Sequence, residues 1–203
     1  MAGEILGVLC SGRGTNLQSI IDAVASGQIK APIGVVITDK PGVMALERAE
    51  KANIPAVCVD RKLYATREEF DAALLAELKK YGVTLVCLAG FMRLLTAEFI
   101  RAYEGRILNI HPALLPSFKG AHAHRDAIAY GAKVSGCTIH FVVEDMDAGP
   151  IILQAAVPVE EGDDEDSLGA RVLVQEHKLY PRAIELFLAG KLTIEGRCVR
   201  IAK

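Results

Sequence analysis

The stretch Ile5–Ala25, ILGVLCSGRGTNLQSIIDAVA, decides the fold. It opens with a short apolar run, Ile5–Leu9, that predicts a buried strand, and it ends with Leu17–Ala25, whose apolar spacing is typical of a helix. Gly12 and Gly14 lie between the two and allow the backbone to turn tightly. The stretch therefore predicts a strand, a loop and a helix, which is the repeating unit of a parallel sheet.

The same alternation continues along the chain. The further expected strands are 33–38, 56–59, 84–89, 106–110, 135–143 and 150–158. The further expected helices are 43–52, 67–80, one that begins near 122–129, and about 167–189, the last interrupted by Pro181. A short Asp- and Gly-rich connection joins the last two strands as a hairpin would, and 191–202 predicts a terminal hairpin. The pattern predicts an α/β protein with a mainly parallel sheet that the hairpin makes mixed.

The composition favours one compact domain with a small-molecule ligand. The 203 residues suffice for a single α/β domain, which we expect to span 1–203. Hydrophobic residues make up 51% and charged residues 24%, and the basic residues are scattered over a chain of net charge −2. We therefore expect no nucleic-acid and no membrane partner. The N-terminus resembles no signal peptide, so we expect a cytoplasmic protein.

The cysteines indicate a reducing compartment. They are Cys10, Cys58, Cys87, Cys137 and Cys198. They are far apart, form no CxxC pair, and four of them lie in apolar runs that read as strands. We therefore expect buried, reduced thiols.

The loop Ser11–Asn16 could hold a phosphate. Its glycines let the amides of Thr15 and Asn16 open a helix whose N-terminus attracts an anion, although a tight turn before a helix is the simpler alternative. The Gly-Lys-Ser/Thr of a Walker A loop is missing. A dinucleotide fingerprint fits only in part, because Leu17 stands at its third glycine position, although Asp39 could meet a ribose. A phosphate monoester therefore fits better than NAD.

A polar pair interrupts the apolar run before Pro112. Asn109 and His111 are two residues apart on an expected strand, so their side chains should project side by side where that strand ends. An amide and an imidazole can together stabilise an oxygen that gains negative charge during acyl transfer. Asp147, in an expected turn, could reach the same edge and favour the charged form of His111. A buried histidine with ordinary hydrogen bonds is the alternative for His111 alone, and the asparagine on the same face favours catalysis.

The other histidines could suggest a metal hydrolase. His122 and His124 form an H-x-H pattern, and imidazole is a common zinc ligand. Nothing in their spacing forces these rings to meet His111 or His140, and 122–129 is more typical of the start of a helix. We therefore expect no metal site.

Three further polar or apolar segments have structural interpretations. The acidic run 163–166 precedes the long helix, where it would complement the helix dipole rather than bind a metal. Glu176 is by default a solvated charge on a helix face. Phe91–Leu95 reads by default as core with one exposed arginine, but it could also line an apolar slot at the carboxyl edge of the sheet, where such folds bind ligands.

Five motifs stand in one order along the chain: Ser11–Asn16 (SGRGTN), Leu88–Arg93 (LAGFMR), Asn109–Pro116 (NIHPALLP), His122–Arg125 (HAHR) and Asp147–Pro150 (DAGP). In this order they resemble the phosphoribosylglycinamide (glycinamide ribonucleotide) formyltransferases of de novo purine synthesis, and the resemblance covers nearly the entire chain. The Asn-x-His-Pro and Asp-x-Gly-Pro elements are shared with other folate-dependent formyltransferases and with formyltetrahydrofolate deformylases. The first loop, the HAHR motif and the Gln-Glu-His at 175–177 are more specific to the ribonucleotide enzymes.

The resemblance implies a three-layer α/β/α, Rossmann-like formyltransferase fold with its active site across the carboxyl edge of the sheet. It implies that the formyl group of 10-formyltetrahydrofolate, the co-substrate, passes to the amine of glycinamide ribonucleotide without a metal. A monomer or a homodimer would suffice for this chemistry.

The resemblance also implies residue roles. The catalytic residues would be Asn109, His111 and Asp147. The substrate-binding residues would be Gly14, Thr15, Asn16, Gln175 and Glu176. The folate-binding residues would be Arg67, Met92, Arg93, Leu94, Leu95, Asn109, Val143, Glu144, Asp145, Met146 and Asp147. Leu173 stands where the family typically has a polar residue, so it implies no substrate contact, and Arg13 is given no role.

Three rival functions share part of this pattern. A formyltetrahydrofolate deformylase would use the same Asn, His and Asp with water as the acceptor, but an additional N-terminal regulatory domain would be expected before the strand at Ile5. A methionyl-tRNA formyltransferase would be expected to have an additional C-terminal domain and a basic surface. A nucleotide-binding module without catalysis would keep Gly12 and Gly14 but would have no use for the Asn, His and Asp together.

Overall fold

The computed structural model describes residues 3–202, which divide into two compact units, one ending at Leu108 and the other beginning at Asn109. The expectation of a single domain over 1–203 stays a prediction. Among the described residues, no helix is both long enough and apolar enough to cross a membrane.

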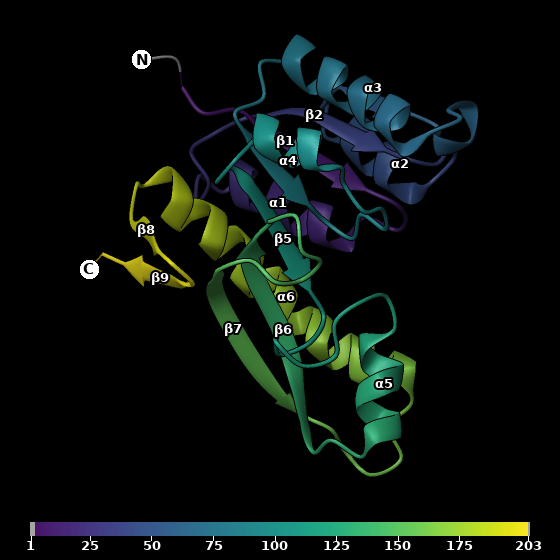
Figure 1. Ribbon diagram of the computed structural model, residues 1–203, viewed down its shortest axis with the longest axis vertical. Coiled ribbons are helices and arrows are strands. Elements are labelled where there is room, and N and C mark those ends of the chain that lie inside the picture. Colours follow the sequence, from purple (N-terminus) through teal and green to yellow (C-terminus); the bar gives the residue numbers. More distant parts are fainter. Residues whose placement is uncertain (1–2, 203) are drawn as a thin grey trace. The chain divides into compact units, whose positions relative to one another are not determined.

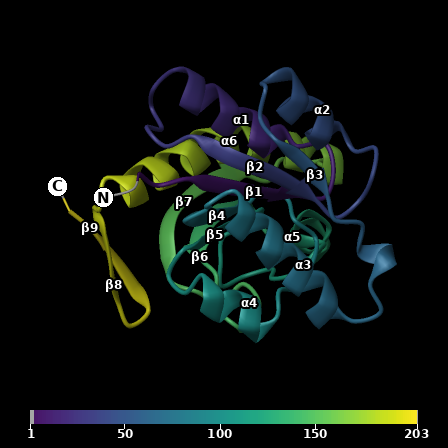
Figure 2. The same ribbon diagram turned by 90° about the horizontal axis from the view of Figure 1, so that it is seen from above.

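The first unit is a parallel sheet between two pairs of helices. Its strand order is β3-β2-β1-β4, and the bounds are β1 (Leu6–Cys10), β2 (Ile33–Thr38), β3 (Ala56–Cys58) and β4 (Leu85–Leu88). Helices cover both faces of this sheet (Figure 2). On one face they are α1 (Thr15–Ala25) and α2 (Met44–Lys51), and on the other α3 (Arg67–Lys80) and α4 (Ala97–Ala102), with a 3₁₀ turn, η1 (Arg61–Leu63), before α3.

The helices on both faces explain the apolar strands of this unit. All five residues of β1 are buried, as is typical of a parallel strand that is covered on both sides. A Cβ on Gly7 would come within 2.6 Å of Leu78 on α3, so glycine lets that helix approach the sheet closely. A capping box between Thr66 and Glu69 begins α3 at Arg67, the residue at which the sequence predicts it to begin.

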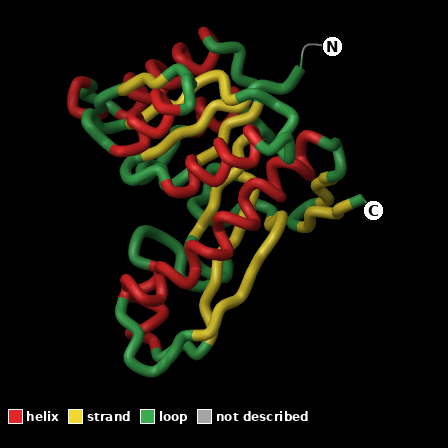
Figure 3. Tube along the Cα trace, turned by 180° about the vertical axis from the view of Figure 1, so that it is seen from behind, coloured by secondary structure: helices red, strands yellow, loops and turns green. Residues whose placement is uncertain are grey.

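The second unit is a mixed sheet with one long helix along it. Its strand order is β5-β6-β7-β9-β8, in which β6 with β7 and β8 with β9 are antiparallel pairs and β7 with β9 is a parallel pair. The bounds are β5 (Ile107–His111, whose last three residues belong to this unit), β6 (Val134–Phe141), β7 (Ile151–Pro158), β8 (Leu192–Glu195), β9 (Cys198–Ile201), α5 (Ala123–Tyr130) and α6 (Glu165–Leu188). Helix α6 runs along β6 and β7 (Figures 1 and 3).

The architecture confirms the predicted fold class, an α/β protein with a mainly parallel, mixed sheet. The predicted cap of α6 is also confirmed. The Asp164 side chain accepts a hydrogen bond from the Ser167 amide at 2.8 Å, and Asp163 forms an ion pair with Arg171. The acidic run therefore begins a helix.

One expectation about the elements is wrong, and two short elements were not expected. Helix α6 continues through Pro181 instead of being interrupted there, because its apolar stripe is buried before and after the proline, from Leu168 and Val172 to Ile184. That burial outweighs the cost of about 3 kcal/mol for a proline inside a helix. Helix α4 and turn η1 were not expected, because six and three residues are too short to show a helical period.

The cysteines are only partly as expected. None of the five, all of which lie among the described residues, forms a disulfide. Cys10, Cys87 and Cys137 are buried, but Cys58 and Cys198 are exposed, so the expectation of buried thiols is wrong for these two. Cys58 ends the outermost strand of the first unit, and Cys198 begins β9 of the terminal hairpin, where less of the chain covers them.

Gly149→Ala should destabilise the protein by about 3 kcal/mol, measured by urea unfolding. A Cβ at this buried glycine would overlap the carbonyl oxygen of Phe141, a backbone group that cannot rotate away. Gly12→Ala is the matched control, since a Cβ there meets nothing within 4 Å, and we expect less than about 0.5 kcal/mol. Equal effects of the two substitutions would contradict this account of Gly149.

Candidate active site

The second unit brings Asn109, His111 and Asp147 into one polar cluster. Asn109 and His111 lie two residues apart near the end of β5, so they share a face of the sheet as the sequence predicts. Asp147 lies in the connection from β6 to β7, with a left-handed backbone at φ 50°. The His111 Nδ1 atom lies 3.5 Å from Asp147 Oδ2, and His111 is only 4% exposed. The imidazole and the carboxylate therefore face each other where little water can screen them.

His140, on β6, connects the remaining members of this cluster. Its Nδ1 lies 2.8 Å from the Phe141 carbonyl oxygen, so Nδ1 carries the hydrogen and Nε2 carries a lone pair. That Nε2 lies 3.1 Å from Asn109 Nδ2, which donates to it, and 3.8 Å from Asp147 Oδ1. Burial lowers the pKa of His140, so the ring stays neutral and keeps its acceptor. His140 thereby fixes the orientation of the Asn109 amide.

Backbone groups of the loop after β5 close the cluster. The Phe118 carbonyl oxygen lies 2.9 Å from His111 Nε2, and the Gly120 amide donates to Asp147 Oδ2 at 2.9 Å. Phe118 has a left-handed backbone, and its ring contacts Tyr130 at a centroid distance of 5.9 Å. Both nitrogens of His111 thus face oxygen atoms, one of a backbone carbonyl and one of a carboxylate. Sequence reasoning missed His140, Phe118 and Gly120, and only His140 has a side chain that could have indicated such a role.

In the first unit, helix α2 packs against the predicted phosphate loop and forms hydrogen bonds with it. Gly14 is the N-cap of α1 with φ 68°, and a Cβ there would lie 2.9 Å from that of Ala45. The Ala45 amide donates to the Gly12 carbonyl, and Arg48 Nε donates to the Arg13 carbonyl at 2.8 Å. Packing against α2 therefore accounts for Gly14 whether or not an anion binds, and a substitution at Gly14 would disturb the fold as well as any ligand.

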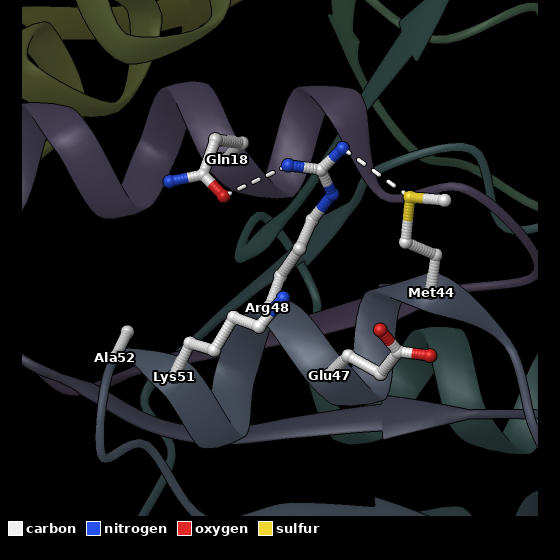
Figure 4. Close-up of a pocket in the computed structure, with 6 residues that line it drawn as sticks. All are labelled: Gln18, Met44, Glu47, Arg48, Lys51 and Ala52. Atoms are coloured by element: carbon white, nitrogen blue, oxygen red, sulfur yellow. Dashed lines mark hydrogen bonds between the residues drawn. The ribbon is translucent and has the colours of Figure 1, made fainter.

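A pocket of about 410 Å³ lies between α1 and α2 (Figure 4). Its lining residues are Gln18, Met44, Glu47, Arg48, Lys51 and Ala52. The Arg48 guanidinium is held by Gln18 Oε1 at 3.0 Å and by Met44 Sδ at 3.5 Å, so it is already engaged within this pocket. The lining contains none of the predicted site residues.

The predicted folate residues of the first unit follow β4, except for Arg67. Met92 and Leu94 are exposed at 64% and 56%, which leaves two apolar side chains on a loop surface. Arg93 Nε lies 2.6 Å from Asp39 Oδ2, and Asp39 is buried. A bound dinucleotide would need the Asp39 carboxylate to accept a hydrogen bond from its ribose. Because that carboxylate is paired with Arg93, the structure does not favour dinucleotide binding at this loop. Arg67 is the exposed first residue of α3, and Leu95 is half-buried.

The other predicted ligand contacts belong to the second unit. Val143, Glu144, Asp145 and Met146 are exposed in the connection that ends at Asp147. Gln175 and Glu176 lie on α6, half-buried and buried respectively, so the interpretation of Glu176 as a solvated charge is wrong. Burial first, and then the charge of Glu176, raises the pKa of the Cys137 thiol to about 12. Gly14, Thr15 and Asn16 belong to the first unit, so their joint action with Gln175 and Glu176 stays a prediction.

The remaining histidines lie at the start of α5. His122 is the exposed N-cap of this helix, and His124 is half-buried, where burial lowers its pKa. Within residues 3–202, no three His, Cys, Asp or Glu side chains gather as a metal-binding group. The helix expected near 122–129 is thus confirmed.

Comparisons with known proteins agree on one family. Residues 6–184 match the family model described as formyl transferase. The phosphoribosylglycinamide formyltransferase of Escherichia coli (strain K12) is 45% identical over 91% of this chain and 87% of its own length. The crystal structure of glycinamide ribonucleotide transformylase 1 from Symbiobacterium toebii, at 52% identity, superposes with a TM-score of 0.97 over 99% of this chain and 95% of that one.

A longer relative contains the same sequence pattern. The trifunctional purine biosynthetic protein adenosine-3 of Homo sapiens is 48% identical over 92% of this chain. The chain spans only 18% of the length of that relative. The similarity therefore concerns one part of the trifunctional protein.

The buried, neutral His140 should make the protein less stable as the pH falls. The unfolded chain binds a proton at this histidine below about pH 6.5, whereas the folded chain does not until a lower pH, so the free energy of unfolding should decrease below about pH 6.5. In His140→Gln this decrease should be shallower, as measured by denaturant unfolding between pH 5 and 8. The exposed His122 provides the control variant, His122→Gln, which should keep the wild-type slope. An unchanged slope in His140→Gln would contradict the neutral assignment.

Proposed function

Because the chain belongs to the formyl transferase family, we propose that it transfers the formyl group of 10-formyltetrahydrofolate to the amine of 5'-phosphoribosylglycinamide. The products are the N-formyl ribonucleotide and tetrahydrofolate, and the reaction belongs to de novo purine biosynthesis. The observation that carries this proposal is the cluster of buried His111 and His140 with half-buried Asn109 and Asp147, because acyl transfer needs oriented donors at a developing oxyanion.

The cluster supplies what each stage of formyl transfer needs. The substrate amine attacks the formyl carbon, the carbonyl π bond breaks, and a tetrahedral adduct with an oxyanion forms. One amide hydrogen of Asn109 is donated to His140, which leaves the second for the oxyanion. His111 would supply the other donor when its Nε2 exchanges the Phe118 carbonyl oxygen for the oxyanion. The bond from carbon to N10 of the folate then breaks. The proton lost by the amine reaches N10 by way of Asp147 and an ordered water.

The acceptor site decides between an amine and water. The amides that open α1 at Thr15 and Asn16 would hold the phosphate of the ribonucleotide, and Glu176 would accept hydrogen bonds from its ribose. Positioning the amine beside the formyl carbon in this way can lower the barrier by about 7 kcal/mol. Water gains no such advantage, so the protein acts as a transferase and not as a deformylase.

The folate would bind on exposed apolar side chains. Met92 and Leu94 of the first unit, and Val143 and Met146 of the second, offer the apolar surface that a flat aromatic ring system needs. Arg67 offers an exposed guanidinium for a folate carboxylate. Arg93 is already paired with Asp39, so its main contribution is to hold the shape of its loop.

The remaining properties follow from the chemistry of small-molecule transfer. We place the enzyme in the cytoplasm, as a monomer or a homodimer, and assign it no nucleic-acid or membrane partner. The net charge of −2 provides no basic surface for a polyanion.

His111→Ala and Asp147→Asn should each lower kcat by about 100-fold or more while changing both KM values by less than about threefold. Both side chains act on charge that develops during the reaction, not on the bound ground state. Steady-state kinetics with each substrate varied in turn provides the measurement. Asp126→Asn, which changes an aspartate of α5 outside the cluster, should retain wild-type kinetics. Losses that fall on KM and leave kcat intact would count against these roles.

Consumption of 10-formyltetrahydrofolate should be rapid only when 5'-phosphoribosylglycinamide is present, with the formyl group recovered on the amine. The assay follows folate deformylation with and without the ribonucleotide and measures free formate in parallel. Glu176→Ala should raise the KM for the ribonucleotide about tenfold without releasing formate, because it removes an acceptor for the ribose and creates no water site. Glu185→Ala, farther along the same helix, is the matched control. Rapid formate release without the ribonucleotide would establish a deformylase instead.

A further inference from the structure

Ser11 joins two loops of the first unit that sequence motifs assign to different substrates. It is the first residue after β1, and it is buried at 6% exposure. Its amide donates to the Gly90 carbonyl at 3.1 Å, and its hydroxyl oxygen accepts from the Met92 amide at 2.9 Å. Strands β1 and β4 are parallel neighbours, with Leu9 opposite Leu88, so their following loops leave the sheet side by side. Two hydrogen bonds through one serine therefore fasten the loop after β1 to the loop after β4.

Beyond its backbone hydrogen bonds at Ala89 and Gly90, the loop after β4, residues 89–96, is held at three further points. The first is Met92, whose amide donates to Ser11. The second is Arg93, whose side chain is paired with Asp39 at the end of β2. The third is Thr96, whose amide donates to Asp71 Oδ2 on α3 at 2.6 Å. Each partner comes from a different element, so the loop has a defined shape although the side chains of Met92 and Leu94 are exposed.

The Ser11 contact acts directly at Met92. A buried serine oxygen is the acceptor for an amide in the middle of a loop that neither strand nor helix hydrogen bonds would hold. Without that oxygen, the Met92 amide loses its acceptor and the loop loses its attachment to Ser11 at this residue. The contacts of Arg93 with Asp39 and of Thr96 with Asp71 hold the residues that follow Met92.

We propose that Ser11 is a positioning residue for the folate, not a ligand of the ribonucleotide phosphate, although it lies in the same motif as Gly14–Asn16. The inference rests on the proposed function, because it takes the loop after β4 as part of the folate site. The Ser11 amide donates to Gly90 and the Ser11 hydroxyl oxygen accepts from Met92, whereas the amides that open α1 begin at Thr15. One motif thus serves two substrates, its first residue the folate and its last residues the phosphate.

Two single variants, one at Ser11 and one at Thr15, test whether the two ends of the motif serve different substrates. Ser11→Ala should raise the KM for 10-formyltetrahydrofolate about fivefold, the effect of losing one neutral hydrogen bond, and leave the KM for the ribonucleotide within twofold. Thr15→Pro, which removes the first amide of α1 at a helix position where proline is tolerated, should do the reverse. Isothermal titration with tetrahydrofolate should show the same fivefold loss for Ser11→Ala, which separates binding from turnover. A general loss of structure would instead move both constants and the melting temperature.

The control and the second variant keep the test decisive. Ser26→Ala removes a serine hydroxyl that donates to the Ala23 carbonyl at the other end of α1, and it should leave both constants unchanged. Should Ser11→Ala fail to fold, Ser11→Cys preserves the size and offers only a weak acceptor, so it should shift the same folate constant. The proposal is overturned if either variant raises the ribonucleotide constant instead, or if both folded variants bind folate as the wild type does.

The outcomes also separate this inference from the proposed function. Wild-type protein that transfers no formyl group would remove the proposed function itself. Active wild type with an unaffected Thr15→Pro variant would remove only the phosphate assignment of that loop. Active wild type with folate binding unchanged in Ser11→Ala would remove only the role of Ser11.

Discussion

The carboxylate of Asp147 is the charge around which the polar cluster of the second unit is arranged. It receives the Gly120 amide, faces His111 Nδ1 at 3.5 Å and lies 3.8 Å from the neutral His140. A part-buried anion needs hydrogen-bond donors, and the Gly120 amide and the His111 ring approach it from two different segments. Its position in turn requires a left-handed backbone at Asp147 and a residue without Cβ at Gly149, two residues later. The two residues of the Asp-x-Gly pattern are therefore needed together, because Gly149 permits the turn that places Asp147.

The sequence could predict which functional side chains on a strand lie together. It could not predict which backbone groups of a loop form hydrogen bonds with them. The spacing of Asn109 and His111 fixes a shared face as soon as a strand is assumed, because side chains alternate along a strand. No comparable rule indicates that the Phe118 carbonyl or the Gly120 amide completes the cluster, since any residue carries those groups. His140 does have a distinctive side chain, but a single histidine in an apolar strand is usually a core residue, and only its distance of 3.1 Å from Asn109 Nδ2 shows otherwise.

The same distinction explains the successes and failures for the fold. Helix α3 begins and ends where its pattern predicts, because a capping box and a sustained apolar spacing mark it. Helix α4 has six residues, fewer than two turns, so no periodicity identifies it. In α6 the local rule against Pro181 is overridden by burial of the stripe that includes Leu168 and Ile184. Glu176 on that stripe was misread for the same reason, because its burial is a property of tertiary packing.

A motif is a stretch of sequence, whereas a binding site is a set of atoms, and the first βα loop shows the difference. Gly14 is needed because its backbone has a positive φ and because Ala45 of α2 packs closely against it. Neither requirement involves a ligand. Ser11 uses its hydroxyl oxygen on the neighbouring loop. Only the amides that begin α1 remain suited to an anion by the physics of helix termini. A six-residue signature can therefore combine turn geometry, packing and loop positioning with a single binding function, and each residue must be assigned by the contacts that it makes.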